Sequence, residues 1–320
     1  MLPRALESLR SQTFKDWVCE VHNDDPVDKF PEELVARVAD PRISVVNHPV
    51  NLGGAATMNA FYAPCKEEFI SILEDDNWWE PEFLEEMLRA ADKHPHVTVF
   101  WANMNLWEEK KDGSFKFTGK TTYPAKSKQL YEEFWWPDPR QIMGAVHSNG
   151  ACLIRSTRGG DYRIPEVPLS ANIELFRERL FPYPLLLIFR PLANFTNTLQ
   201  TDRTHARNAW GLAMAMAVAA FFRHAEWTKD EMEKYWKQCR SSRPPCINHL
   251  LNAAFLERKA QGFFGFVKKR EVLRWIIGLL RRPGLFITLV LGKQRFTTWW
   301  KFLDGQTRLK FQEAERARSN

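Results

Sequence analysis

The sequence predicts an α/β protein with a mostly parallel central sheet flanked by helices, followed by a helical carboxyl-terminal extension. Between residues 3 and 107, short runs rich in β-branched and aromatic residues alternate with stretches of helical periodicity. Such alternation is typical of parallel sheets, because each parallel pairing needs a crossover connection. The expected strands are 18–23, 43–48, 68–75 and 97–107, and the expected helices are 31–40, 54–63 and 81–94.

The second half of the chain has a different pattern. A DG dipeptide within 110–120 predicts a hairpin, and 150–156 reads as one more strand. From Leu169 onward the apolar periodicity predicts helices, with the clearest stretches at 205–224, 228–239, 247–261 and 268–281. We therefore expect a helical region over 205–320, after an α/β domain over 1–204.

The composition excludes several protein classes. The chain has 320 residues, of which 44% are hydrophobic and 26% charged, so it is neither disordered nor of low complexity. Five cysteines without a CxxC pair argue against a disulfide scaffold and a structural zinc site, and they favour a reducing compartment. The first ten residues lack the apolar core of a signal peptide, and no uncharged run in the tail approaches the roughly 20 residues of a membrane span.

The net charge of +6 is concentrated in the tail. Residues 263–320 contain 13 Lys and Arg against 4 Asp and Glu. Because tryptophans are interleaved with these cations, at Trp275, Trp299 and Trp300, the tail suits an anionic membrane surface. The alternative is that its helices pack on the rest of the protein and their charges are solvated. No nucleic-acid partner is expected, because the signatures of the usual RNA modules are missing and residues 1–262 carry a net negative charge.

Acidic and glycine residues follow three of the expected strands. Asp24 and Asp25 follow the first, NLGG at 51–54 follows the second, and Glu74, Asp75 and Asp76 follow the third. Ligands of open α/β sheets bind at the carboxyl ends of the strands, and a glycine-led helix start can accept a phosphate. Three adjacent carboxylates are tolerable around a divalent cation, and their oxygens favour Mg²⁺ or Mn²⁺. The alternative is that these are ordinary turn and helix-cap residues.

These motifs, in this order, resemble the family-2 glycosyltransferases. The resemblance rests on LESLRSQTFKDWVCEVHNDDPVD and on NHPVNLGGAATMNAFYAPCKEEFISILEDDNWWEPEFLEEM, and extends loosely to 145–180. It implies a GT-A fold, with a nucleotide-sugar half at about 1–107 and an acceptor half at about 108–204. It also implies a metal-dependent hexosyltransferase that inverts the sugar, using a nucleotide sugar (a UDP-sugar foremost) and a carbohydrate or lipid-linked acceptor. The implied setting is polysaccharide or glycolipid synthesis in the cytoplasm, peripherally on the inner face of the cell membrane.

The resemblance also implies roles for individual residues. Asp24 would contact the base, Asp75 would hold the ribose and Asp76 would bind Mn²⁺ or Mg²⁺, with Glu74 touching the metal through water. Further nucleotide contacts are expected from Asp25, Asn51, Gly53 and Asn59. The cation would neutralise charge on the leaving nucleoside diphosphate.

Two departures from the family pattern bear on catalysis. Family members begin with an apolar strand that here would precede Met1, which leaves a gap in the expected sheet. The family's general base is an Asp, and Asn172 stands at that position. We therefore expect Glu174 to be the catalytic base, with Asp161 and Glu166 as alternatives.

Other interpretations remain open. A non-catalytic glycosyltransferase-like binding protein would explain Asn172, although the acidic run at 74–76 speaks against it. A nucleotidyltransferase would show a Gly-rich loop with a basic residue after its first strand, which is not seen. On the acceptor side, residues 147–150 and the pair Trp135-Trp136 are candidates for sugar contacts, and the alternatives are a polar turn and core packing.

Overall fold

The computed structural model describes residues 1–124, 129–142, 144–156, 161–166, 172–199, 207–241 and 247–319. The chain forms two compact units. The first comprises 1–135, 147–164 and 181–202, and the second comprises 136–146, 165–180 and 203–320. The second unit thus combines the carboxyl-terminal region with two short segments from the part of the chain expected to be α/β.

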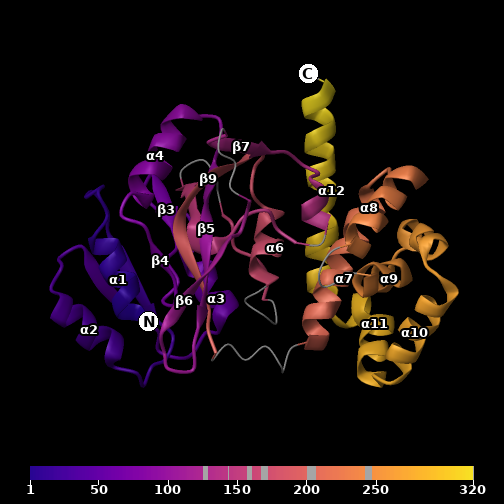
Figure 1. Ribbon diagram of the computed structural model, residues 1–320, viewed down its shortest axis with the longest axis horizontal. Helices are drawn as coiled ribbons and strands as arrows, with labels where there is room; N and C mark the ends of the chain where they lie inside the picture. Colours follow the sequence, from indigo (N-terminus) through magenta and orange to yellow (C-terminus); the bar gives the residue numbers. More distant parts are fainter. Residues whose placement is uncertain are drawn as a thin grey trace. The chain divides into compact units, whose positions relative to one another are not determined.

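The strands of the first unit form two sheets (Figure 1). A two-stranded parallel sheet holds β1 (Cys19–Asn23) and β2 (Ile43–Asn47). The other sheet has the order β3-β8-β5-β9-β4, with β6 on β5 and β7 on β9. Its strands are β3 (Phe69–Ser71), β4 (Trp78–Trp79), β5 (Val99–Glu109), β6 (Phe115–Thr121), β7 (Tyr131–Phe134), β8 (Cys152–Arg155) and β9 (Leu185–Asn197).

The α/β class and the helical extension are confirmed, and the strand directions are mixed. The longest pairing, β5 with β9, is parallel, as is β1 with β2. The shorter strands β3, β4, β6, β7 and β8 add antiparallel pairings. The expected hairpin is present as β5 and β6, and its turn contains Gly113 with a φ of 77°.

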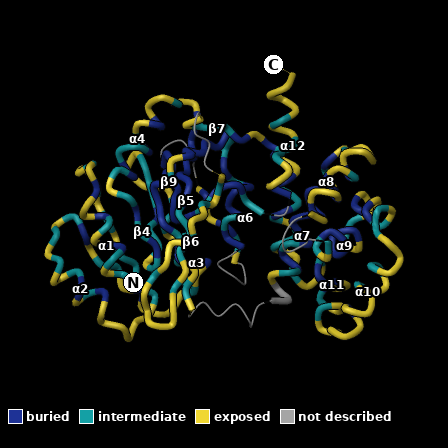
Figure 2. Tube along the Cα trace, in the orientation of Figure 1, coloured by how far each residue is buried: buried dark blue, intermediate teal, exposed yellow. Residues whose placement is uncertain are grey.

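The apolar core of the first unit lies between α4 (Phe83–Lys93) and the larger sheet. Acidic residues occupy the first turn of α4 and Lys93 its last turn, which suits the helix dipole. Phe83, Met87 and Ala90 on one face of α4 are fully buried against residues of β5, β8 and β9. Figure 2 shows β5 and β9 as the buried centre of this unit. A second, smaller cluster joins α1 (Leu2–Arg10), α2 (Phe30–Val38) and β2 through Leu6, Leu34 and Ile43.

The expectation of a helical chain from Leu169 onward is wrong for β9. Leu185 to Phe189 form a continuous apolar run, and all five are buried inside the sheet. A short apolar run of this kind has no alternation to distinguish a strand from a buried helix. The expected strand at 68–75 is likewise shorter, because only Phe69–Ser71 pairs and the acidic run forms a turn.

Helices make up most of the second unit. α7 (Arg207–His224) is buried along most of its length. It packs against α9 (Ile247–Leu256) and α12 (Thr297–Ser319), and the Phe221 and Phe311 rings lie 5.3 Å apart. Among the described residues no single helix is long and apolar enough to cross a membrane, whereas α10 and α11 reach that length and composition together, bent by 95°. The α-helices are α6 (Ile173–Glu178), α7 (Arg207–His224), α8 (Lys229–Ser241), α9 (Ile247–Leu256), α10 (Lys269–Leu280), α11 (Pro283–Arg295) and α12 (Thr297–Ser319), and η1 (Pro139–Ile142) and η4 (Arg258–Phe266) are 3-10 helices.

Candidate functional site

Asp24 connects the end of β1 to the loop that begins α3 (Gly54–Phe61). Its Oδ1 accepts a hydrogen bond from the Leu52 amide at 2.8 Å, and its Oδ2 accepts one from the Gly53 amide at 2.9 Å. Burial opposes ionisation of Asp24, but hydrogen bonds from His48 and from these amides outweigh it and lower the pKa of the carboxyl group. The structure therefore places the ionised carboxylate of Asp24 against the Gly53 amide, at the start of α3.

Gly53 has a backbone conformation that suits glycine alone. Its φ is 78° and its ψ is 157°, in a region that L-residues avoid. This conformation aims its amide at Asp24, while the next residue begins α3. Gly53 is also the N-cap residue of α3. The glycine pair is therefore in part an ordinary helix start, as the alternative interpretation expected.

Two histidines that sequence patterns did not indicate extend the polar chain from Asp24. His48 Nδ1 lies 3.0 Å from Asp24 Oδ1, and His48 Nε2 lies 3.1 Å from His22 Nδ1. His22 Nε2 in turn faces the Glu20 carboxylate at 3.5 Å. Burial lowers the pKa of His22. His22 lies on β1 and His48 directly follows β2, so the parallel register of β1 on β2 brings the two rings together.

The other expected nucleotide contacts differ in their surroundings. Asp25 accepts a hydrogen bond from the Val27 amide, as the turn interpretation expected. Asn51 is exposed in the loop before Gly53. Asn59 exchanges two hydrogen bonds with the backbone of Ile164, at 2.7 and 2.9 Å, and so ties α3 to the 161–166 segment. The fold thus uses Asn59 structurally, and its expected nucleotide contact stays a prediction.

The acidic run at 74–76 forms the turn between β3 and β4. Glu74 Oε2 accepts a hydrogen bond from Asn77 Nδ2 at 2.6 Å, and Asp75 is exposed. Burial, together with the charge of Asp75, raises the pKa of Asp76 despite the nearby Arg4. Burial and the charge of Asp75 therefore oppose ionisation of Asp76, and a cation beside these two carboxylates would favour the ionised form of Asp76.

Arg4 lies directly beside this turn. Its Nη2 donates to the backbone carbonyl of Asp76 at 2.8 Å. Its guanidinium is sandwiched between aromatic rings, 3.8 Å from the centre of Trp78 and 4.0 Å from that of Phe115. Burial lowers the pKa of Arg4, but the group stays cationic at neutral pH. Sequence analysis missed Arg4 because its partners lie more than 70 residues away.

Gly150 explains how the Glu74 carboxylate is accommodated. A Cβ at residue 150 would stand 2.8 Å from Glu74 Oε2, so a larger residue there would displace that oxygen from its present position. The carbonyl of Gly150 accepts a hydrogen bond from the Trp79 indole at 2.8 Å, and the neighbouring Asn149 accepts one from the Tyr62 hydroxyl. Residues 149 and 150, expected to contact the acceptor sugar, are thus neighbours of the acidic run.

The three candidate bases have different environments. Asp161 forms an exposed ion pair with Arg163 at 2.6 Å, and this partner lowers the pKa of Asp161. Glu166 is exposed, and its backbone carbonyl accepts the Trp299 indole hydrogen bond. Glu174 is half-buried in the first turn of α6. Asn172 is fully buried, and neither polar atom of its side chain has a hydrogen-bond partner within the described part of the chain.

The expected aromatic pair divides into two environments. Trp136 is buried and packs against Phe221 and Phe311 in the second unit, as the core interpretation expected. Trp135 is 54% exposed. His147 is buried and packs edge-on against Phe181. The exposed Trp135 therefore retains a free ring face that a sugar could contact.

Comparison with known proteins identifies the first part of the chain. Residues 1–143 match the model of glycosyl transferase family 2. The putative glycosyltransferase EpsH of Bacillus subtilis is 33% identical over 135 residues, 39% of this chain and 36% of that protein. The uncharacterized glycosyltransferase MJ1057 of Methanocaldococcus jannaschii is 26% identical over 125 residues, 36% of this chain and 43% of that protein. The chain thus matches less than half the length of these relatives.

Solved structures support the same fold. The S. aureus TarS 1-349 structure in complex with UDP superposes with a TM-score of 0.54 at 15% identity, and the match covers 99% of this chain and 88% of that one. A structure of S. aureus TarS gives a TM-score of 0.56 at 14% identity, with coverages of 95% and 52%. These likenesses show the GT-A fold, and residues 1–143 are similar to glycosyl transferase family 2.

Proposed function

We propose that this protein, whose first 143 residues are similar to glycosyl transferase family 2, transfers a sugar from a nucleotide-sugar donor to an acceptor hydroxyl. The observation that carries the proposal is the pairing of Asp24 with the glycine-led start of α3, in the same unit as the carboxylates of Glu74, Asp75 and Asp76. The first group suits a nucleotide, and the second suits the cation that accompanies a diphosphate. The products are a polysaccharide or a glycolipid.

UDP is the nucleotide we propose. It is the ligand in the TarS complex, which shares this fold at low identity. Asp24 holds its carboxylate ionised at the end of β1, and an ionised carboxylate can accept the imide N–H of a uracil ring. Asp25 follows Asp24 in the loop after β1, and Asn51 and Gly53 lie in the loop before α3 that Asp24 contacts. Asp75 is exposed on the acidic turn, where it would reach the ribose hydroxyls.

The donor set of the acidic turn fits Mn²⁺ or Mg²⁺. It consists of carboxylate oxygens, and burial, together with the charge of Asp75, raises the pKa of Asp76, which a bound cation would counteract. Asp76 would bind the cation, with Glu74 held near it by Asn77. When bound, the cation supplies charge neutralisation for the leaving diphosphate. Arg4 adds a permanent positive charge at the same turn. The Trp78 and Phe115 rings on either side of its guanidinium restrict its movement.

Glu174 is the group that we propose to accept the acceptor's proton. Direct displacement with inversion needs a carboxylate within hydrogen-bond reach of the attacking hydroxyl. Asp161 is neutralised by Arg163, and Asn172 has no basic oxygen, so the half-buried Glu174 is the better candidate. Asn172 would orient the acceptor through its unpartnered amide rather than take the proton.

We also propose that the second unit binds an anionic membrane surface. Helices α10 and α11 expose apolar side chains, among which Leu273 is 57%, Leu280 68% and Val290 50% exposed. Cationic residues at 268–270, 281 and 282 flank these side chains. Apolar insertion combined with attraction to anionic headgroups is the chemistry of interfacial helices. Such binding would place the enzyme at lipid-linked acceptors.

Calorimetric titration of UDP in the presence of Mn²⁺ tests the proposal. The parent protein is expected to bind UDP more tightly with Mn²⁺ than without it, and Asp76→Asn is expected to lose this difference. Asp92→Asn is a matched control, since Asp92 is an exposed carboxylate on α4 in the same unit. If UDP bound equally to the parent and to Asp76→Asn at every Mn²⁺ concentration, the assignment of the acidic turn would be wrong.

A further inference from the structure

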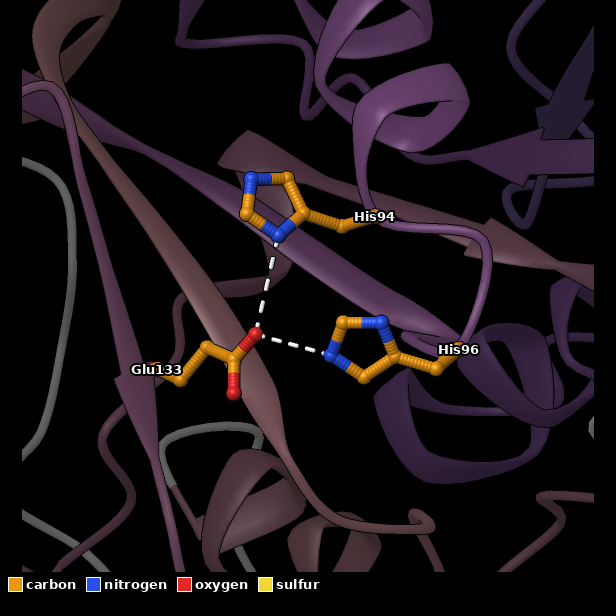
Figure 3. A group of neighbouring side chains, drawn as sticks. All are labelled: His94, His96 and Glu133. Atoms are coloured by element: carbon orange, nitrogen blue, oxygen red, sulfur yellow. Dashed lines mark hydrogen bonds and ion pairs between the residues drawn. The ribbon is translucent and has the colours of Figure 1, made fainter.

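A cluster of two histidines and one glutamate lies outside the groups that we assign to glycosyl transfer. His94 and His96 follow the carboxyl end of α4, and Glu133 lies on β7, all within the first unit (Figure 3). We infer that His94, His96 and Glu133 form a binding site for a divalent transition-metal ion, with Zn²⁺ as the expected occupant.

A tight turn presents both histidines to the same side. The Val97 amide donates to the His94 carbonyl at 3.0 Å, so residues 94–97 form a closed turn with Pro95 at its second position. The His94 amide donates to Ala90 at 3.0 Å, which anchors the turn to α4. As Figure 3 shows, both imidazole rings consequently point toward the Glu133 carboxylate.

The distances between the ligand atoms suit one metal ion. Glu133 Oε1 lies 3.6 Å from His94 Nδ1 and 2.8 Å from His96 Nε2, and the three atoms lie within 4.8 Å of one another. At bond lengths of about 2.0–2.1 Å and tetrahedral angles, ligand atoms stand about 3.3–3.4 Å apart. The two distances to Glu133 bracket that value, and the two histidine nitrogens lie within 4.8 Å of each other, so rotations of the side chains would complete the geometry.

The ligand set and its exposure favour zinc over the cations of the acidic turn. Two imidazoles and one carboxylate suit Zn²⁺ and its neighbours in the first transition row, whereas Mg²⁺ and Mn²⁺ prefer oxygen ligands. The side chains of His94, His96 and Glu133 are 23%, 54% and 29% exposed, which leaves a path for the ion and room for water as the fourth ligand. The His94 ring is also held by edge-on packing on Tyr131 at 5.2 Å.

The ion would join two elements that are far apart in the chain. Glu133 belongs to β7, which pairs with the central strand β9, whereas the histidines end α4, which covers the sheet. A metal bond across this contact would fix the end of α4 to the sheet. Because an ion that binds only the folded state stabilises it, Zn²⁺ is expected to raise the melting temperature.

The test uses the full chain carrying Asp76→Asn, so that the acidic turn does not contribute a second metal site. After treatment with a chelator, titration with Zn²⁺ is expected to show one bound ion and a higher melting temperature. Adding His96→Gln or Glu133→Gln is expected to weaken Zn²⁺ binding at least tenfold and to remove the thermal shift. Co²⁺ bound to the first protein is expected to show the visible absorption of a tetrahedral site, and this absorption should be lost in both variants.

Glu132→Gln is the matched control, because Glu132 neighbours Glu133 on β7 but points to the opposite face of the strand. It is expected to leave Zn²⁺ binding unchanged. Equal Zn²⁺ affinity with and without His96→Gln would overturn the inference and leave only an ion pair between Glu133 and the histidines. An equal loss in Glu132→Gln and Glu133→Gln would overturn it too. Both results are independent of UDP binding, so they do not depend on the proposed function.

Discussion

Replacing Gly53 with alanine tests the link between backbone conformation and the nucleotide site. A Cβ at residue 53 would meet no atom within 4 Å, so the substitution causes no collision. The cost comes from the φ of 78° and ψ of 157°, which L-residues rarely adopt. Strain of this kind costs about 1–3 kcal/mol, which corresponds to a fall in melting temperature of about 2–12 °C for a unit of this size.

The same substitution is expected to weaken UDP binding. If the backbone relaxes, the Gly53 amide no longer aims at Asp24 Oδ2, and Asp24 loses one of the groups that orient it. A hydrogen bond is worth about 1 kcal/mol net, so we expect the dissociation constant for UDP to rise about fivefold. Differential scanning fluorimetry and calorimetric titration measure the two effects.

Gly113→Ala separates the two effects. Gly113 has nearly the same φ, 77°, and an equally open Cβ position, but it lies in the hairpin turn between β5 and β6. It is expected to lower the melting temperature by a comparable amount and to leave UDP affinity unchanged. If Gly53→Ala melted with the parent, the strain argument would be refuted, and if both variants weakened UDP binding equally, the role of the Gly53 amide would be refuted.

Three further predictions concern pH, catalysis and the membrane surface. The lowered pKa of Asp24 means that its ionised form stabilises the fold above the ordinary pKa of about 3.9, and that this contribution is lost as the pH falls through the lower, folded-state pKa. The melting temperatures of Asp24→Asn and the parent should therefore differ by a constant amount from pH 7 to about 5, and converge below about pH 4. Glu174→Gln should reduce turnover about 10²–10⁴-fold without changing UDP affinity, and normal turnover would transfer the role of base to another carboxylate. In flotation with anionic vesicles at low salt, the double variant Leu273→Gln/Leu280→Gln should be released from the vesicles, whereas Leu309→Gln on α12 should stay bound. If the parent, the double variant and Leu309→Gln all floated with the vesicles to the same extent, α10 would be excluded as the membrane contact.

Local patterns in the sequence predicted the first unit well up to β5. β1 and β2, α2, α3 and α4 each lie within two residues of the predicted bounds, because each has a strong period and a clear start or stop residue. β9 was not predicted, because its apolar run is buried on both faces and lacks alternation. Apart from the hairpin of β5 and β6, the antiparallel pairings also escaped prediction, since strand direction depends on contacts between segments distant in the chain.

The candidate site divides in the same way. The positions of Asp24, Gly53 and the acidic run at their strand ends follow from local sequence, and the structure joins Asp24 to the Gly53 amide by a hydrogen bond. The partners of those residues do not follow from local sequence. His48 reaches Asp24 through the register of β2 on β1, and Arg4 reaches Asp76 across more than 70 residues. No pattern within a short window contains both members of such a pair.

The surroundings of Glu74 depend on the pairing of strands that are distant in the chain, although local sequence identifies the acidic run that contains it. β8 pairs antiparallel with β3, and this pairing brings the residues before β8 to the residues after β3. Gly150 therefore meets the Glu74 carboxylate, and its carbonyl receives the Trp79 indole from β4. Asn77 donates to the same Glu74 oxygen and accepts from the Thr196 amide of β9. Glu74 is thus bound by the neighbouring Asn77, which is itself tied to β9, and it lies beside Gly150 just before β8. A cation at this turn would therefore meet a carboxylate that contacts between distant segments help to position.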